Sequence, residues 1–161
     1  MQRILFFFGI VALVAGCSQT VSSPPLAQAE EGSAKSSVSS GECPQSRKTP
    51  KAPGHLLKKK NPQTSPAAVR DGKELYHKTS KPFTCETCHG VKGDGLGDPD
   101  FESNPPARNF TCKATMGPLT DGQLFWVIKR GSPTTSMPGF GGNLSDDEIW
   151  KLVAYLRTFA K

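Results

Sequence analysis

The chain has 161 residues, a formal net charge of +6 at pH 7 and only 8% aromatic residues, and it is rich in Gly (16) and Pro (14). A chain of this length can form one ordinary domain, and the composition predicts a folded part that is smaller than the whole. Residues 66–161 carry 12 basic and 11 acidic residues, so most of the positive excess precedes them. Basic residues without interleaved aromatic ones do not predict nucleic-acid binding.

The first residues, MQRILFFFGIVALVAGC, have the pattern of a secretory signal. One positive charge, Arg3, precedes an apolar run from residue 4 to residue 15. A run of about 12 residues is too short to cross a bilayer of roughly 30 Å as a helix. A short apolar run that ends in small residues is typical of a cleavable export signal, so we expect residues 1–16 to be removed.

The end of this run, VAGC at residues 14–17, resembles the bacterial lipobox. The resemblance implies a lipoprotein signal peptide over residues 1–16 and a lipid on Cys17, and two or more acyl chains anchor a protein stably. Ser18 after this cysteine resembles outer-membrane sorting, which favours the outer over the inner membrane. The predicted location is therefore the periplasmic side, with the lipid as the membrane anchor.

Residues 17–65 are predicted to be a lipid-anchored flexible tether. Ser, Pro, Lys and Gly dominate this stretch, and it has no helical or alternating period. Such a segment cannot bury enough apolar area to offset the cost of ordering its backbone. Cys43 lies in the later part of the tether, and a disulfide there can pin this part onto the domain.

Three amphipathic helices are predicted in the remaining chain, residues 66–161. The first begins at Ser65, a plausible N-cap, with Pro66 at the favoured first position. The second begins at Thr120 and the third at Ser145, each with the spacing of a capping box. No alternating run is long enough for a sheet, so the predicted fold class is all-α. Three short helices form a small core, and we expect a large apolar group to complete it.

The stretch CETCHG, residues 85–90, allows three interpretations. A structural zinc site usually takes four ligands from two paired clusters, and the second cluster is missing. A redox dithiol normally follows a strand in a βαβ unit, and no strand is predicted here. Cys-x-x-Cys-His is the pattern of covalent haem attachment. In this interpretation, which the spacing favours, Cys85 and Cys88 form thioethers with one haem c, and His89 is an axial ligand of its iron.

The iron then has a sixth ligand or an open site. Met137 in TTSMPGFGG is the first candidate, because its Pro- and Gly-rich loop between the second and third helices can fold over the far face of the porphyrin. Met116, which precedes a Gly-Pro pair, is the reserve candidate. His77 and His55 are weaker candidates, because His77 closely precedes the motif and His55 lies in the tether.

From Gly72 to its end the chain resembles the class I, single-haem c-type cytochromes, here in the form of a bacterial lipoprotein. Four stretches match in the order of that family: DGKELYHK, CETCHG, SMPGF and IWKLVAYLRTF. The resemblance implies a small cytochrome c fold, with three to four short helices and long loops around one covalently bound haem c. Residues 66–161 are then the cytochrome c domain.

The resemblance also implies positions for particular side chains. Gly72 and Tyr76 are expected to meet the last helix, and Trp126 is expected near the haem edge. Members of the family often have a Pro soon after the haem motif, whose carbonyl accepts a hydrogen bond from the axial His. Here Pro99 comes later than usual, so that hydrogen bond stays unassigned.

Two of the five cysteines, Cys43 and Cys112, remain once a lipid and a haem are assigned to the others. In an oxidising compartment two such thiols tend to form a disulfide, which here would clamp the tether onto the domain. Two buried free thiols are the alternative, because sequence alone cannot fix a pairing.

Ligation by His89 and Met137 saturates the iron, so no catalytic residue is assigned and we expect an electron-transfer protein rather than an enzyme. His/Met ligation raises the reduction potential of a c-type haem. The prediction is a membrane-tethered one-electron carrier between a donor and an acceptor, both exported respiratory or dehydrogenase proteins. Two alternatives stay open: a fixed haem subunit of a larger oxidoreductase complex, and a haem-based ligand sensor if Met137 is not the stable axial ligand.

Overall fold

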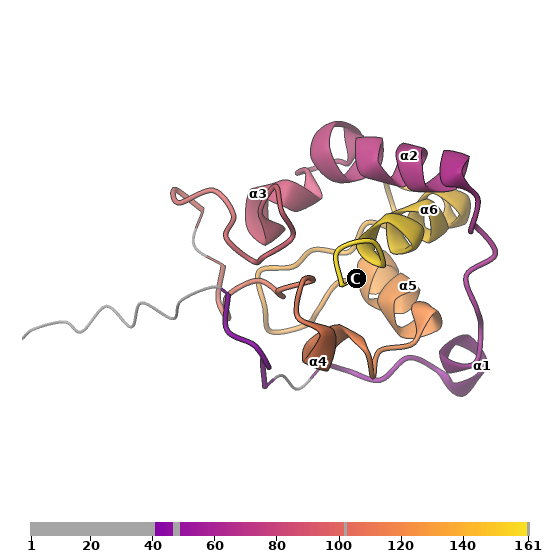
Figure 1. Ribbon diagram of the computed structural model, residues 1–161, viewed down its shortest axis with the longest axis horizontal. Helices are drawn as coiled ribbons and strands as arrows, with labels where there is room; N and C mark the ends of the chain where they lie inside the picture. The colour runs from indigo at the N-terminus through magenta and orange to yellow at the C-terminus, as the bar shows by residue number, and fades with distance from the viewer. Residues whose placement is uncertain (1–40, 47–48, 102, 161) are drawn as a thin grey trace, which may run out of the picture. The chain divides into compact units, whose positions relative to one another are not determined.

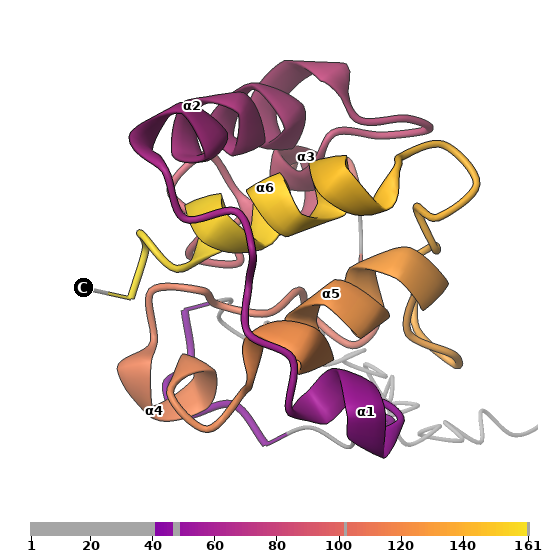
Figure 2. The same cartoon turned by 90° about the vertical axis from the view of Figure 1, so that its right-hand side faces the viewer.

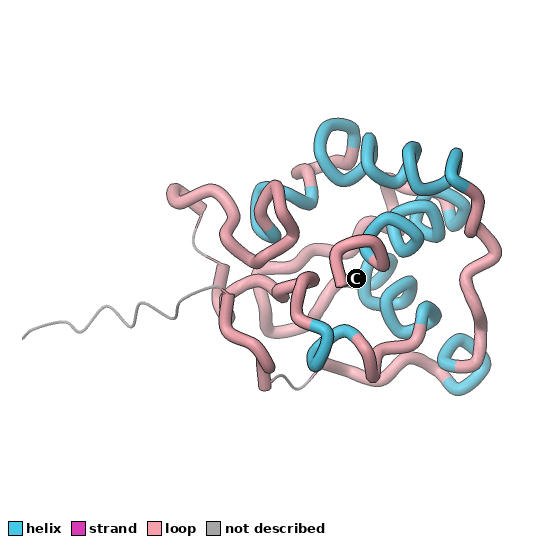
Figure 3. Tube along the Cα trace, in the orientation of Figure 1, coloured by secondary structure: helices cyan, strands magenta, loops and turns pink. Residues whose placement is uncertain are grey.

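The computed structural model describes residues 41–46, 49–101 and 103–160. The predicted signal peptide, Cys17 and the beginning of the tether lie outside the described residues. The described part is helical and contains no strand (Figures 1 and 3), which confirms the all-α fold class. None of its helices is long and apolar enough to cross a membrane.

The helical segments of the described chain follow in the order α1 (Gly54–Leu57), α2 (Pro66–Glu74), the π-helical turn η1 (Leu75–Thr79), α3 (Cys85–His89), α4 (Lys113–Met116), α5 (Asp121–Arg130) and α6 (Asp146–Leu156). Helices α2, α5 and α6 are the three that the sequence predicted. The others have four or five residues, too few for a periodic pattern to reveal them. Long loops connect α3 to α4 and α5 to α6 (Figure 3).

Helix α2 begins at the predicted N-cap. The Ser65 side chain accepts a hydrogen bond from the N–H of Ala68 at 3.1 Å, and Pro66 occupies the first turn. The helix continues directly into η1, where Tyr76 is fully buried. The Tyr76 hydroxyl donates to the carbonyl oxygen of Gly90 at 2.7 Å, so this helical segment is tied to the end of α3.

Helix α6 begins with the capping box that the sequence predicted. The Ser145 hydroxyl accepts from the N–H of Glu148 at 3.3 Å, and the Glu148 carboxylate accepts from the N–H of Ser145 at 2.8 Å. Hydrogen bonds from the backbone and side chain of Ser145 lower the pKa of Glu148, because they stabilise the charged carboxylate. Behind the cap, the helix buries Ile149, Trp150, Leu152, Val153, Ala154, Tyr155 and Leu156.

Helix α5 also begins at its predicted N-cap, where the Thr120 hydroxyl accepts from the N–H of Gln123 at 3.1 Å. Gly131, with φ 77°, ends it as expected. The predicted capping box, however, is wrong in its second half. The Gln123 side chain donates to the carbonyl oxygen of Pro50 and accepts from the N–H of Ala52, both at 2.9 Å. The segment before α1 offers the Gln123 side-chain amide both a donor and an acceptor. Gln123 therefore bonds to this segment and not to the N-cap of its own helix.

Helix α6 lies between α2 and α5 (Figures 1 and 2). Helix α2 meets it at Gly72, where a Cβ would come within 2.0 Å of the carbonyl oxygen of Lys151. Tyr76 packs edge-on against Tyr155 with ring centroids 5.4 Å apart, so both residues expected to meet the last helix do so. The core around this contact consists of Leu75, Tyr76, Phe110, Met116, Leu124, Phe125, Ile128, Phe140, Leu144, Ile149, Trp150, Leu152, Val153, Tyr155 and Leu156.

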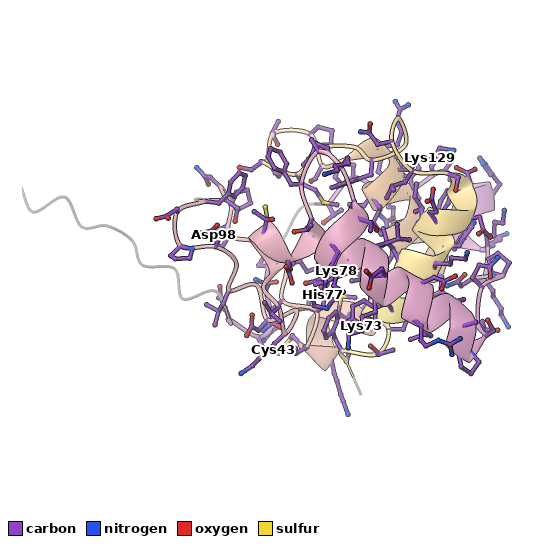
Figure 4. All side chains as sticks on the ribbon, turned by 90° about the horizontal axis from the view of Figure 1, so that it is seen from above. Cys43, Lys73, His77, Lys78, Asp98 and Lys129 are labelled. Carbon is purple, nitrogen blue, oxygen red and sulfur yellow. A yellow bond between two sulfur atoms is a disulfide. The ribbon has the colours of Figure 1, made fainter. Side chains whose placement is uncertain are left out.

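Residues 43–46 and 49–65, here called the N-terminal strap, pack on this helical core. Cys43 (labelled in Figure 4) forms a disulfide with Cys112. The backbone of Leu56 in α1 also lies close to Gly122 of α5, because a Cβ added to Gly122 would lie 1.6 Å from the carbonyl oxygen of Leu56. The later part of the predicted tether is thus joined to the domain predicted for residues 66–161, the arrangement that a disulfide at Cys43 would allow. The strap is held largely by hydrogen bonds and close backbone contacts, which leave no hydrophobic period in the sequence.

Candidate functional site

A cavity of about 270 Å³ lies between α3, the strap, the loop after α3 and the loop between α5 and α6. Its apolar walls include Phe83, Phe101, Ala107, Phe110, Val127, Ile128, Pro138, Phe140, Leu152 and Leu156. The residues with polar or sulfur atoms in its lining include Cys85, Cys88, His89, Arg108 and Met137. Apolar walls with a few convergent polar groups are typical of a site that binds a cofactor.

Helix α3 consists of the CETCH motif itself. Gly90, with φ 79°, ends this short helix directly after His89. One helical segment therefore presents Cys85, Cys88 and His89 to the same cavity, and neither cysteine forms a disulfide. The spacing that singled out these three residues in the sequence is thus realised as one cluster in the cavity wall.

Both thiols of the motif are held in their neutral form. Burial raises the pKa of Cys85 to about 12 and also raises the pKa of Cys88, because apolar surroundings penalise a thiolate. Reactive redox cysteines are thiolates, so this environment disfavours the redox interpretation. Among the described residues, no group of three or more His, Cys, Asp and Glu side chains could hold a metal ion, which disfavours a structural zinc site. A thioether sulfur carries no charge and suits the same walls.

His89 is oriented by the loop that follows α3. Its Nδ1 donates a hydrogen bond to the backbone carbonyl oxygen of Arg108 at 3.0 Å, and its ring stacks on Phe110 with centroids 4.4 Å apart. Because the carbonyl can only accept, Nδ1 carries the proton and Nε2 of the neutral ring has the lone pair that can bind a metal. A metal-ligating His typically donates its other ring N–H to such a carbonyl. The sequence left this partner unassigned, and Arg108 lies well beyond Pro99.

Met137 reaches the same cavity from the loop between α5 and α6. This loop folds back on α5, since the N–H of Phe140 donates to the carbonyl oxygen of Ile128 at 2.9 Å and the N–H of Ser132 to that of Met137 at 3.2 Å. Gly131 allows the close return, because a Cβ there would come within 2.8 Å of the Met137 carbonyl oxygen. The cavity thus receives an imidazole from α3 and a thioether from a loop distant in sequence.

The other candidate ligands lie elsewhere. Met116 is only 1% exposed in the core and does not line the cavity. His77 is hydrogen-bonded to side chains of α3 and α6, and His55 is exposed on α1. Among the described residues, Met137 is therefore the methionine that lines the cavity.

Trp126, which the family resemblance placed near the haem edge, is not among the residues that line this cavity. Val127 and Ile128 of the same helix line it. In an α-helix each residue is rotated by about 100° from the previous one, so Trp126 lies about 200° around the helix from Ile128. Helix α5, which the resemblance placed near the haem edge, is thus part of the cavity wall through Val127 and Ile128.

The strap also contributes to the cavity wall, through Ser46 and Thr49. The Arg108 guanidinium donates to the Thr49 hydroxyl at 2.8 Å, which joins the strap to the loop that holds His89. Sequence reasoning missed these residues, because their polar and aperiodic surroundings predicted a tether.

The residues present fit a haem c group. Two neutral sulfurs and an imidazole come from one helical segment, a thioether sulfur comes from a loop, and the walls are apolar. When bound, such a group supplies a one-electron couple at its iron.

Residues 67–156 match the protein family described as cytochrome c oxidase, cbb3-type, subunit III, which is more than half of the chain. The chain belongs to this family. A c-type cytochrome domain implies haem c as the cofactor and electron transfer as the activity. Residues 1–18 of the cytochrome match the prokaryotic membrane lipoprotein lipid attachment site, so it is an exported, lipid-anchored protein.

Two solved structures are similar to this cytochrome. A chain of the reducing HAO-like protein complex of Kuenenia stuttgartiensis is 27% identical, with a TM-score of 0.53, over 63% of this chain and 47% of that one. The cytochrome thus spans about half the length of that chain. Cytochrome cL of the marine methylotrophic bacterium Methylophaga aminisulfidivorans is 24% identical, with a TM-score of 0.43, over 74% and 71% of the two chains. None of the curated proteins matches the cytochrome.

Proposed function

We propose that the protein is a membrane-tethered one-electron carrier with a single haem c. Cys85 and Cys88 bind this haem through two thioethers, and His89 and Met137 are its axial ligands. The observation that supports the proposal is that these four side chains, from α3 and from the loop between α5 and α6, line one apolar cavity. With both axial positions occupied by the protein, the site exchanges electrons without binding a substrate at the metal.

The protein's own residues set the properties of this site. The hydrogen bond from Nδ1 of His89 to the carbonyl of Arg108 fixes the tautomer and the ring orientation. Met137 supplies a soft, neutral sulfur, which raises the reduction potential. The apolar walls around Phe110 and Phe140 exclude water and limit reorganisation when the charge of the site changes.

In this proposal a lipid on Cys17 holds the domain on the periplasmic side of a membrane, with the outer membrane favoured over the inner. The match of residues 1–18 to a lipid attachment site supports the anchor. The donor and the acceptor are redox proteins of a respiratory or dehydrogenase system. Electron carriage between such partners requires that one domain meets both, which a lipid-anchored domain can do by lateral movement.

A fixed haem subunit of a larger oxidoreductase complex is the second candidate. The family description names a subunit, and the similar Kuenenia stuttgartiensis chain belongs to a complex. Extraction of native membranes with a mild detergent, followed by size separation and visible spectra, distinguishes the two. A mobile carrier elutes at the size of the single chain in its micelle, whereas a subunit elutes with other haem or flavin proteins.

The test of the proposed cofactor is denaturation of the purified protein in acidified organic solvent. The red colour is expected to stay with the polypeptide in the wild type and to be lost when Cys85 and Cys88 are both replaced by Ser. A potentiometric titration of the wild type should follow a one-electron curve, and carbon monoxide should bind poorly to the reduced protein. Pigment that washes free of the wild-type chain would contradict covalent attachment, and rapid carbon monoxide binding would favour a ligand sensor.

A further inference from the structure

We propose that the N-terminal strap tunes the haem site by holding the carbonyl group that orients His89, with Gln45 as the positioning residue. This inference rests on the proposed function, in which His89 is an axial ligand. It concerns a segment that the sequence pattern assigned to a tether and that lies outside residues 67–156, the part matched to the family.

The Gln45 side chain makes two hydrogen bonds that bracket Arg108. Its Nε2 donates to the carbonyl oxygen of Ala107 at 3.1 Å, and its Oε1 accepts from the N–H of Asn109 at 2.8 Å. One planar amide therefore fixes the peptide groups on both sides of Arg108. The Arg108 carbonyl belongs to the same peptide group as the Asn109 N–H. Its oxygen accepts the hydrogen bond from Nδ1 of His89 at 3.0 Å.

Other contacts fix the strap itself at this place. The N–H of Gln45 donates to the Thr115 hydroxyl at 3.0 Å, and the disulfide joins Cys43 to Cys112. The Arg108 side chain donates to Thr49 at 2.8 Å. The backbone of Gln45 is therefore anchored, so its side chain can hold the Arg108 loop in one position.

The loop around Arg108 needs such external support. Residues 105–111 contain no helix, so no ladder of backbone hydrogen bonds fixes the direction of their carbonyl groups. The N–H of Phe110 donates to the carbonyl oxygen of Gly93 at 2.6 Å, but the two peptide groups beside Arg108 are held by Gln45. Buried backbone N–H and C=O groups are usually hydrogen-bonded. Here the Gln45 side chain supplies the partners that a neighbouring strand would supply in a sheet.

The hydrogen bond to the carbonyl makes the imidazole more basic and a stronger donor to the metal. A stronger donor stabilises the oxidised iron and lowers the reduction potential. Loosening the Arg108 carbonyl should therefore weaken the hydrogen bond from His89 and move the potential to a more positive value.

The test uses the intact, haem-loaded protein and two substitutions of glutamine. Gln45→Ala removes both bonds to the Arg108 loop, and Gln63→Ala is the matched control, because the Gln63 amide bonds to Asp147 and does not line the cavity. The Nδ1–H resonance of His89 is followed by nitrogen-15 NMR of the reduced protein, together with the potential. In Gln45→Ala we expect the Nδ1 proton of His89 to exchange with solvent about tenfold faster, a change of the size expected for the loss of one hydrogen bond. We also expect the reduction potential to rise.

Gln45→Met is the second variant, in case Gln45→Ala folds poorly. It keeps a neutral side chain of similar length and loses both hydrogen bonds to the Arg108 loop, so changes in the same direction are expected. Unchanged exchange in a folded Gln45 variant would overturn the inference. A potential that falls without faster exchange would also overturn it, because Gln45 would then only shield the site from water. A wild-type protein without the His89 resonance or without covalent haem would instead contradict the proposed function.

Discussion

Nδ1 of His77 lies 2.5 Å from Oε2 of Glu86, the residue that follows the first cysteine of the haem motif. Nε2 of the same ring lies 2.9 Å from the hydroxyl oxygen of Tyr155. Since the carboxylate can only accept, Nδ1 is the donor of the first hydrogen bond. The partner of Nε2 is the Tyr155 hydroxyl, whose pKa is raised by burial. One imidazole on η1, beside Lys78 in Figure 4, therefore connects α3 to α6.

Replacement of His77 by Phe should destabilise the protein without changing its haem ligation. The substitution leaves two partly buried polar groups without their partner, which we expect to reduce the free energy of unfolding by about 2 kcal/mol. Urea unfolding measures this change, and His55→Phe on exposed α1 is the control, with a small effect. A changed ferric spectrum in His77→Phe would instead place this histidine among the ligands.

Met137→Ala should remove the weak far-red absorption band of methionine-bound ferric haem. The iron becomes five-coordinate or water-ligated, and the reduction potential falls because the soft sulfur donor is lost. Met116→Leu is the matched control. This change in the core should keep the band and cost less than about 1.5 kcal/mol of stability. Loss of the band in the control, with retention in Met137→Ala, would reverse the assignment of the two methionines.

Gly72→Ala should destabilise the contact between α2 and α6. Its Cβ would lie 2.0 Å from the carbonyl oxygen of Lys151. Because this oxygen belongs to the backbone, the steric clash can only be relieved by moving the helices apart. We expect a net loss of about 1–3 kcal/mol in thermal or urea unfolding. At exposed Gly142 nothing lies within 4 Å of an added Cβ, so Gly142→Ala should change stability by less than about 0.5 kcal/mol. Equal effects at the two sites would contradict the close contact.

The capping box of α6 should make stability depend on acidic pH. Because the folded protein lowers the pKa of Glu148, the ionised carboxylate contributes stability above the unfolded pKa of about 4.3, and this contribution is lost as the pH falls through the folded pKa. Glu148→Gln should therefore be less stable than the wild type at pH 7, with a smaller difference at pH 3. Urea unfolding at several pH values tests this, with Glu42→Gln as an exposed control. A difference that is constant with pH would contradict it.

The parts of this fold that sequence reasoning recovered are those with local causes. Ser65, Thr120 and Ser145 begin their helices because each side chain accepts from an N–H three residues ahead, a relation visible in the sequence. The haem motif is equally local, since Cys85, Cys88 and His89 occupy one short helix.

The parts that escaped prediction depend on distant partners. Gln123 has the right residue type for a capping box, but it bonds to the strap, which only the tertiary structure brings near. The acceptor for His89 is a backbone carbonyl, a group that every residue has and that no residue type indicates.

Among the described residues, Cys43 and Cys112 form a disulfide, and the chain between these two cysteines contains Cys85 and Cys88. Four cysteines can pair in three ways, and an exporting compartment favours oxidation. Under the proposed function, the inner pair therefore has to stay reduced until its thiols add to the vinyl groups of the haem, while the outer pair that encloses it is oxidised. The host cell thus has to deliver an oxidant and a reductant to the same nascent chain and direct each to its own pair.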